Sequence, residues 1–143
     1  MGYECKRAAD QFALLGQKYN FAVENDEYYT ISVFSKEKMS TDVELGMLGH
    51  LDVVPAGEGW KTPPFCAVER AGYVFGRGSS DNKGPLLMCL YAMRCMKELN
   101  ITTRHSIRLI AGCDEEDRMS DIDHYLRIHT PPVYTLNCDG AWA

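Results

Sequence analysis

Apolar side chains recur every three or four residues in two parts of the chain, the spacing that places them on one face of a helix. The first part is residues 4–19, where this face is formed by Ala8, Phe12, Leu15 and Tyr19. The second is residues 85–99, where it is formed by Leu86, Cys89, Leu90, Met93, Met96 and Leu99. Gly84-Pro85 suits a helix start, because proline at the first position gives up no hydrogen bond. A third, shorter helix is predicted over residues 121–129, ahead of Pro131-Pro132.

Runs of β-branched, aromatic and other apolar residues predict strands in the remaining segments. They cover residues 28–34, 43–48, 105–113 and 133–138. A short hairpin is expected from residues 66–69 and 73–75, on either side of Ala71-Gly72. Within the strand at 105–113, alternation places two sets of residues on opposite faces, Ile107, Leu109 and Ala111 on one and Arg108 and Ile110 on the other.

The order of these elements predicts the fold class. From residue 73 onward the order is strand, helix, strand, helix, strand, which is typical of a parallel sheet covered by helices. Residues 55–64 carry three prolines and two glycines and are expected to form an ordered loop. We therefore predict an α/β fold, a three-layer α/β/α arrangement with a mostly parallel sheet.

Composition and charge narrow the class of partner. With 143 residues, 45% of them hydrophobic, the chain can bury the core of one domain. Fifteen Lys and Arg against twenty Asp and Glu give a net charge of −5 without a basic run, which argues against a nucleic-acid or anionic-membrane partner. No stretch approaches the roughly 18 apolar residues of a membrane-spanning helix, and the N-terminal residues carry charges where a signal peptide is apolar.

The six cysteines form no CxxC pair. Three of them, Cys89, Cys95 and Cys113, lie within apolar patterns expected in the core. Free cysteine is often buried as a small apolar residue, whereas disulfide frameworks belong to short secreted chains. We interpret the cysteines as reduced thiols in a cytoplasmic protein.

Acidic and imidazole side chains follow the ends of predicted elements in four clusters. These are His50 with Asp52, Asp81, Glu115 with Glu116, and Asp139. Functional groups of α/β sheets collect at the carboxyl ends of strands, so we expect the four clusters at one edge. So many carboxylates would repel one another unless a divalent cation lay between them. Mixed His and carboxylate ligands suit Zn²⁺, with Mn²⁺ or Co²⁺ as substitutes, and two ions sharing a carboxylate would use them all.

Each cluster also has a simpler interpretation. His50 and Asp52 are compatible with a hydrogen-bonded turn, and Asp81 with a helix cap. Glu115 and Glu116, within DEED, are compatible with a solvated acidic run, and Asp139 before glycine with a turn. The other histidines, at 105, 124 and 129, show no ligand spacing, and Arg77 between two glycines is given no role.

The combination of these motifs resembles the M20 metallopeptidase family, and within it the dipeptidase branch of PepV-type and carnosinase-like enzymes. The resemblance rests on GHLDVVPAGEGW (49–60), PF (64–65), YVFGRGSSDNKGP (73–85), GCDEED (112–117) and the later Asp139. The motifs stand in the family's order and run from about residue 28 to the end of the sequence. They imply a zinc-peptidase-like catalytic domain and a small peptide substrate.

The resemblance also implies a role for each candidate residue. His50 and Asp139 would bind one metal ion, Asp81 would bridge two ions, and Glu116 would bind the second. Asp52 would orient and polarise the His50 imidazole from behind. Glu115 would be the general base that takes a proton from the attacking water and passes it to the leaving amine.

The sequence departs from the family pattern in several places. Asn82 follows the bridging aspartate, and Cys138 stands where the family has proline. The family's last histidine ligand and its lid or dimerisation domain have no counterpart in residues 1–143, which we therefore interpret as a partial catalytic domain. The second ion would be left with Asp81 and Glu116, so we expect weak or empty occupancy there. Exposed sheet edge and apolar face are expected to drive self-association.

Two classes of function follow from the sequence. The first is zinc-dependent hydrolysis of a dipeptide bond by metal-activated water, and N-acyl amino-acid deacylation uses the same metal core. The second is a truncated fragment without catalysis of its own, which at most binds metal or a partner chain. The PAGEGW segment at 55–60 favours the dipeptidase branch.

Overall fold

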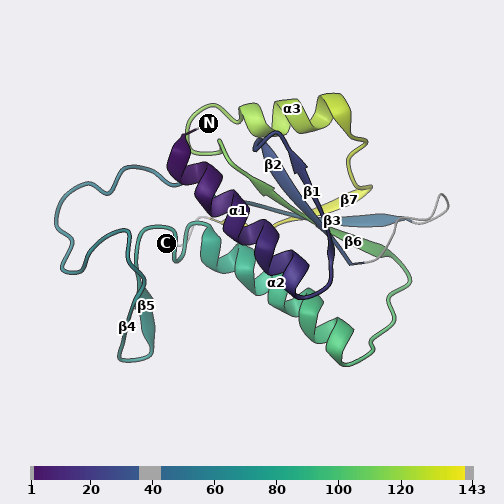
Figure 1. The fold of residues 1–143 in the computed structure, drawn as a ribbon, viewed down its shortest axis with the longest axis horizontal. Helices are drawn as coiled ribbons and strands as arrows, with labels where there is room; N and C mark the ends of the chain where they lie inside the picture. Colours follow the sequence, from purple (N-terminus) through teal and green to yellow (C-terminus); the bar gives the residue numbers. More distant parts are fainter. Residues whose placement is uncertain (1, 36–42, 141–143) are drawn as a thin grey trace.

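The computed structural model describes residues 2–35 and 43–140 (Figure 1). The helices are α1 (Tyr3–Lys18), α2 (Lys83–Glu98) and α3 (Ser120–Ile128). The strands are β1 (Ala22–Asp26), β2 (Thr30–Phe34), β3 (Glu44–His50), β4 (Val68–Arg70), β5 (Tyr73–Phe75), β6 (Ser106–Gly112) and β7 (Tyr134–Asn137). All three predicted helices are present, with ends within two residues of those expected.

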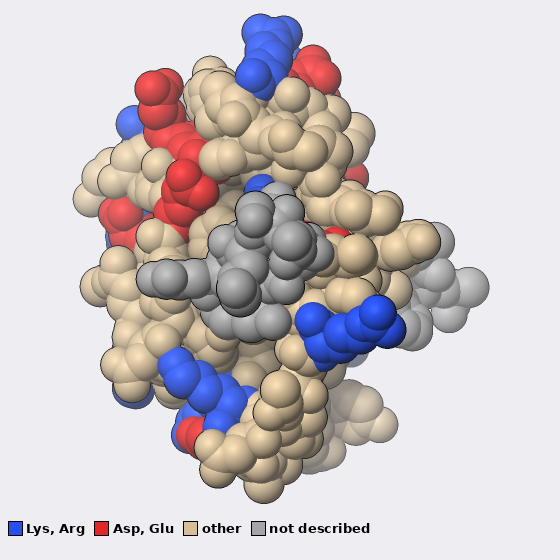
Figure 2. Space-filling model, turned by 90° about the vertical axis from the view of Figure 1, so that its right-hand side faces the viewer, with Lys and Arg blue, Asp and Glu red and all other residues tan. Residues whose placement is uncertain are grey.

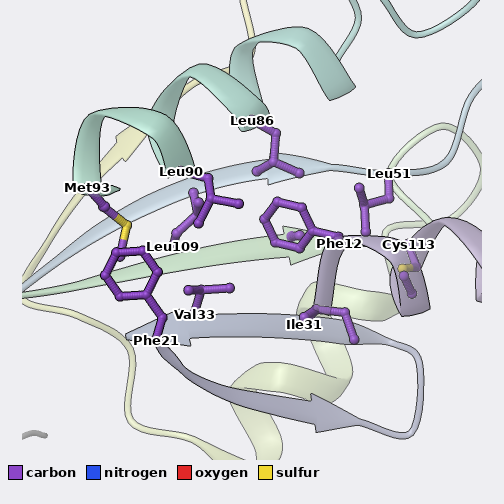
Figure 3. Close-up of a cluster of buried hydrophobic side chains, with 12 residues drawn as sticks. Phe12, Phe21, Ile31, Val33, Leu51, Leu86, Leu90, Met93, Leu109 and Cys113 are labelled. Atoms are coloured by element: carbon purple, nitrogen blue, oxygen red, sulfur yellow. The ribbon is translucent and has the colours of Figure 1, made fainter. Parts of the chain in front are cut away.

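Five strands form one mixed sheet in the order β1-β2-β6-β3-β7. Strand β3 pairs in parallel with β6 on one side and with β7 on the other. Strands β1 and β2 extend the sheet through antiparallel pairings beyond β6. Helices α1 and α2 cover one face and α3 the other (Figures 1 and 3). The α/β class is confirmed, but the sheet is mixed rather than mostly parallel, because β1 and β2 join it through antiparallel pairings and the parallel pairing is confined to β6, β3 and β7 among the described strands.

Two features of the sheet differ from the prediction. Strand β1 was not expected, because its sequence AVEND lacks the β-branched and aromatic run of a typical strand. Strand β5 was expected to begin the parallel alternation, but it pairs only with β4 in a separate hairpin. The strand that precedes α2 in the main sheet is instead β3, and the long loop and the hairpin lie between them.

The hydrophobic core lies between the sheet and the helix pair α1 and α2 (Figure 3). Phe12 of α1 and Leu90 of α2 contact the sheet face that carries Val33 and Leu109. Side chains of β6 alternate between the two faces of the sheet as predicted, and Leu109 and Ala111 lie on the core face. Burial of this apolar surface is the main force that fixes α2, and with it the site described below, against β3 and β6.

The opposite face of the sheet is polar where α3 packs on it. Arg108 of β6 forms an ion pair with Glu44 of β3, with 2.7 Å between Nη2 and Oε2, and both side chains are buried. Nη1 of Arg108 also donates a hydrogen bond to the hydroxyl of Tyr125 on α3. The buried cation and anion thus satisfy each other and link three elements.

The surface carries charges of both signs. Figure 2 shows one side of the molecule, where most acidic side chains gather at the upper left and basic side chains at the top and in the lower part lie next to single acidic ones, on a largely uncharged surface. Within residues 2–35 and 43–140, none of the helices is long and apolar enough to cross a membrane. Among the cysteines expected in the core, Cys113 is buried and Cys89 half-buried, but Cys95 is exposed because it lies on the outer side of α2.

Candidate metal centre

The candidate site lies where the parallel strands β6, β3 and β7 end. His50 is the last residue of β3 and pairs with Gly112, the last residue of β6. Glu115 and Glu116 lie in the turn after β6, and Asp139 lies two residues beyond β7. Because parallel strands end at the same edge, these three segments meet there.

The imidazole of His50 is the centre of the group. Its Nε2 atom lies 3.0 Å from Oδ1 of Asp81, 3.5 Å from Oδ2 of Asp139 and 3.9 Å from Oε2 of Glu115. The His50 side chain is 2% exposed and that of Asp81 is 62% exposed, so the imidazole forms the floor and the carboxylates face outward. The structure thus brings together residues that the sequence separates by up to 89 positions.

These side chains form two sets of potential ligands that share His50. One set is His50, Glu115 and Asp139, and the other is His50, Asp81 and Glu116. In each set one donor atom from every residue lies within 4.8 Å of the others. A nitrogen and several carboxylate oxygens at these separations match the donor chemistry of Zn²⁺ and related divalent ions.

Asp52 lies behind the imidazole, on its Nδ1 side. Nδ1 is 3.1 Å from the backbone oxygen of Asp52 and 3.4 Å from its Oδ1. The other carboxylate oxygen accepts a hydrogen bond of 3.0 Å from the backbone N–H of Glu116. Asp52 therefore connects the end of β3 to the turn after β6.

Burial alone would raise the pKa of Asp52, but its hydrogen bonds with His50 and with the Glu116 backbone outweigh this effect and lower the pKa.

The electrostatic field of the carboxylates acts on His50. Burial alone would lower the pKa of His50, but the hydrogen bond and charge of Asp52 and the charge of Glu115 outweigh it and raise the pKa to about 9. The pKa of Glu115 is raised, first by burial and then by the charges of Asp139 and Glu116, against the opposing effect of His50. A carboxylate with a raised pKa accepts a proton more readily than a free glutamate does.

Asn82 is a site residue to which the sequence assigned no role. It is 1% exposed, and its Oδ1 accepts a hydrogen bond of 3.2 Å from the backbone N–H of His50. Its Nδ2 donates to Oδ1 of Asp139 at 3.2 Å and to the backbone oxygen of Cys138 at 3.3 Å. The amide thus joins the ends of β3 and β7 at the start of α2. Gly49 permits this approach, since a Cβ atom there would clash with Oδ1 of Asn82.

The first residues of α2 also fix the segment that follows β3. Lys83 donates from Nζ to the backbone oxygen of Leu51 at 2.7 Å, which fixes the segment between His50 and Asp52. Asn82 rather than Asp81 is the N-cap residue of α2, so the interpretation of Asp81 as a helix cap does not hold. The only sequence signal for Asn82 and Lys83 was their position next to Asp81.

The remaining histidines lie elsewhere. His129 has its Nε2 atom 3.0 Å from Oδ2 of Asp26, near the β1 edge, and with Glu24 these residues form another set of potential ligands. Oδ2 of Asp26 also accepts a hydrogen bond from Thr30, so this carboxylate is already paired. His124 stacks on Tyr29, with 4.2 Å between ring centroids. His124 and His129 thus lie away from the candidate site, and the expectation that they are not metal ligands stays a prediction.

One groove on the described surface is separate from this group. It has a volume of about 480 Å³ and lies between the long loop and the β4–β5 hairpin, where it is lined by residues including Trp60, Tyr73 and Phe75. None of the candidate metal ligands lines it. Arg77 also belongs to this region, since it lies over the Trp60 ring and donates to the backbone oxygen of Ala56 at 2.9 Å.

Known proteins share both the sequence and the fold. The Beta-Ala-Xaa dipeptidase of Lactobacillus delbrueckii subsp. lactis is 39% identical over 102 residues, which are 71% of this chain and 22% of that protein. Human carnosine dipeptidase 1 superposes with a TM-score of 0.79 at 24% identity, over 97% of this chain and 33% of that one. The M20 family metallo-carboxypeptidase Sso-CP2 from Sulfolobus solfataricus superposes with a TM-score of 0.76 at 20% identity, over 95% and 32%.

The chain spans about a quarter of the length of the curated relatives it matches. The model of Peptidase family M20/M25/M40 matches residues 46–135, a segment that includes most of the candidate site and more than half of the chain. The chain therefore belongs to peptidase family M20/M25/M40.

Proposed function

We propose that this chain forms the metal-binding part of the catalytic domain of a zinc-dependent dipeptidase. The observation that carries the proposal is the convergence of carboxylates from three separate segments on the Nε2 atom of His50. Without a cation, these mostly unpaired negative charges would repel one another at the edge of the sheet. A divalent ion would neutralise them, and the mixed nitrogen and oxygen donors suit zinc, with manganese or cobalt as substitutes.

The two ligand sets assign the residues. As the family resemblance implies, His50 and Asp139 would hold one ion, Glu116 would hold a second, and Asp81 would serve both, while His50 is the residue that both sets of potential ligands contain. With His50 assigned to the first ion, the second would rely on the two carboxylates of Asp81 and Glu116. We therefore propose that the second ion binds more weakly to this chain. Asp52 would orient His50 through Nδ1 and keep Nε2 directed at the first ion.

The chemistry fits hydrolysis of an amide bond. A bound zinc ion supplies Lewis acidity, which lowers the pKa of water and polarises a carbonyl group. Glu115 faces the same space with a raised pKa, and it would take the proton from the attacking water. The same carboxyl group would then give that proton to the leaving amine.

A dipeptide is the substrate we favour. The 39% identical relative is named for cleavage of Beta-Ala-Xaa dipeptides, and the match supports the same substrate class here. Deacylation of N-acyl amino acids would use the same ligands, so it is the alternative that a substrate panel must separate. Because the cysteines of the described chain are all free, we also propose a reducing, cytoplasmic location.

The test combines metal analysis with a substrate panel. The purified chain, reconstituted with Zn²⁺ or Mn²⁺, is assayed with β-Ala-His, Leu-Gly and an N-acetyl amino acid. Hydrolysis of the dipeptides that Glu115→Gln abolishes without loss of bound metal would support the proposal. Preference for the N-acetyl substrate would favour the deacylase. Stoichiometric metal binding without turnover would identify the chain as a metal-binding fragment that lacks catalysis on its own, and absence of bound metal would contradict the proposed centre.

A further inference from the structure

Two thiols meet next to the candidate metal ligands. Cys89 lies on α2, and Cys138 directly precedes Asp139. Their Sγ atoms are 3.1 Å apart and in hydrogen-bonding contact, although 49 residues separate them in the sequence. Both side chains are half-buried, so they remain within reach of small molecules.

The backbone holds the two thiols opposite each other. The N–H of Cys138 donates to the backbone oxygen of Leu48 on β3 at 2.8 Å. The backbone oxygen of Cys138 accepts from Nδ2 of Asn82, at the start of α2. Cys138 is thus fixed on one side to the sheet and on the other to the helix that carries Cys89. The contact between the sulfur atoms therefore follows from the packing of two anchored elements.

The contact also activates one thiol. The hydrogen bond between the two thiols lowers the pKa of Cys89 to about 7, and burial opposes this effect. The thiolate is the nucleophilic form of cysteine, so Cys89 is the member of the pair that reacts first.

We propose that Cys89 and Cys138 form a site of reversible oxidation, at which a small-molecule disulfide converts the two thiols into an intramolecular disulfide. With glutathione disulfide, the Cys89 thiolate attacks one sulfur, the reagent's S–S bond breaks and one glutathione thiolate leaves. Cys138 then attacks the Cys89 sulfur of the mixed disulfide and expels the second glutathione. Two electrons pass from the cysteines to the reagent, and the two thiol protons end on the two glutathione molecules.

The new bond would connect α2 to the residue before Asp139. The sulfur atoms need to approach from 3.1 Å to about 2.05 Å, a movement that side-chain rotation can supply. The bond would close a loop of 49 residues and so restrict the unfolded chain. It would also tie the segment after β7, an edge strand with exposed residues, to the hydrophobic core through α2.

The other cysteines define the competing outcomes. Cys5 approaches the backbone oxygen of Cys113 at 3.5 Å, but Cys113 is 2% exposed and shielded from an oxidant in solution. Cys66 and Cys95 are exposed and, within the described chain, are not hydrogen-bonded to another sulfur atom, so their oxidation would give mixed or intermolecular disulfides. A bond between Cys89 and Cys138 is therefore the expected intramolecular product.

The experiment equilibrates the 143-residue chain in glutathione redox buffers, blocks free thiols with iodoacetamide and maps the product by mass spectrometry. Tryptic cleavage after Lys83, Arg94, Lys97 and Arg127 places Cys89 in residues 84–94, Cys95 in 95–97 and Cys138 in 128–143. We expect residues 84–94 linked to 128–143, a mass loss of two hydrogen atoms and four alkylated cysteines out of the six. The oxidised chain should melt about 10 °C higher than the reduced chain.

Two variants provide the controls. Cys138→Ser should lose the cross-link and leave a glutathione adduct on Cys89, whereas Cys95→Ser, on the same helix, should keep the cross-link. The inference is overturned if the wild-type chain gives a Cys5–Cys113 bond, gives only glutathione adducts, or needs Cys95 for the cross-link. Because the map is read on the wild-type chain, these outcomes stand even if Cys138→Ser does not fold.

Discussion

The Nε2 atom of His50 lies 3.0 Å from Oδ1 of Asp81, although 31 residues, including a long loop and a hairpin, separate them in the sequence. The imidazole is held by the end of β3 and the carboxylate by the start of α2. Their distance is therefore set by the packing of α2 on β3, and the hairpin between them is not part of that packing. The contact makes these two residues the centre of the proposed metal site.

Replacing Asp81 should separate metal binding from folding. Asp81→Asn keeps the shape of the side chain and removes the charge that Asp81 contributes to its ligand set with His50 and Glu116. Because changing an outer-shell partner already costs about 10–100-fold in metal affinity, loss of this ligand should cost at least that much. The Asp81 side chain is 62% exposed, so the melting temperature of the metal-free chain should change little. Calorimetric titration with Zn²⁺ measures the affinity.

Asp117→Asn is the matched control for Asp81→Asn. Asp117 is an exposed acidic residue next to Glu116, and it belongs to neither ligand set. Its replacement removes the same unit of charge and should leave zinc affinity nearly unchanged. Equal losses in the two variants would mean that binding reflects the overall negative charge of this edge.

Asp52→Asn tests whether the carboxylate behind His50 orients the imidazole. Zinc affinity should fall about 10–100-fold, the usual cost of losing such a partner. In the metal-free chain the pKa of His50 should fall below its value of about 9, because Asp52 is the largest source of the increase. NMR titration of the histidine ring measures this pKa, and an unchanged value would contradict the role given to Asp52.

The same variant changes the pH dependence of folding. A histidine whose pKa is raised in the folded state adds stability that is fully present below its unfolded pKa of about 6.5. This stability is lost as the pH rises through the folded value of about 9. Urea denaturation of the metal-free chain between these values should therefore show a smaller decline for Asp52→Asn than for the wild type.

Much of the site could be predicted because its residues follow apolar runs that the sequence marks clearly. The strand before His50 and the strand before Glu115 are both buried in the sheet, and their pattern is strong. Asn82 could not be found in this way. Its function depends on the approach of β7 and on the absence of a side chain at Gly49, and neither is visible in the residues around it.

The sheet shows the same limit of sequence patterns. The residues of β1 include Glu24, Asn25 and Asp26, which are unfavourable in isolated strands, and they form a strand because β2 supplies a hydrogen-bonding edge. The pattern of β5 is that of a good strand, yet its side chains are exposed and it joins only β4. Pairing with other strands therefore decides that β1 belongs to the main sheet and β5 does not, whereas local composition alone would favour β5 over β1.

Arg108 should be the most sensitive polar position on the α3 side of the sheet. Arg108→Ala would remove the guanidinium from its ion pair with the buried carboxylate of Glu44, and breaking such a pair costs about 3–5 kcal/mol in comparable proteins. Arg118→Ala, whose partner Asp117 is exposed, should change the free energy of unfolding by less than about 0.5 kcal/mol. Urea denaturation measures the free energy of unfolding of both variants. The double variant Arg108→Met/Glu44→Leu should recover much of the stability that Arg108→Ala loses.

The exposed apolar edge of the sheet should cause the isolated chain to self-associate. Strand β7 pairs with β3 on one side. Two of its apolar side chains are largely exposed, Tyr134 at 68% and Leu136 at 64%. An edge strand with apolar side chains is a template for pairing with a second copy. Size-exclusion chromatography with light scattering should therefore detect a dimer or larger species at micromolar concentration.

Leu136→Lys should shift the chain to monomer, because a charge on the edge opposes pairing, whereas Leu126→Lys on the outer face of α3 should not. A wild-type chain that is already monomeric would show that this edge does not pair by itself.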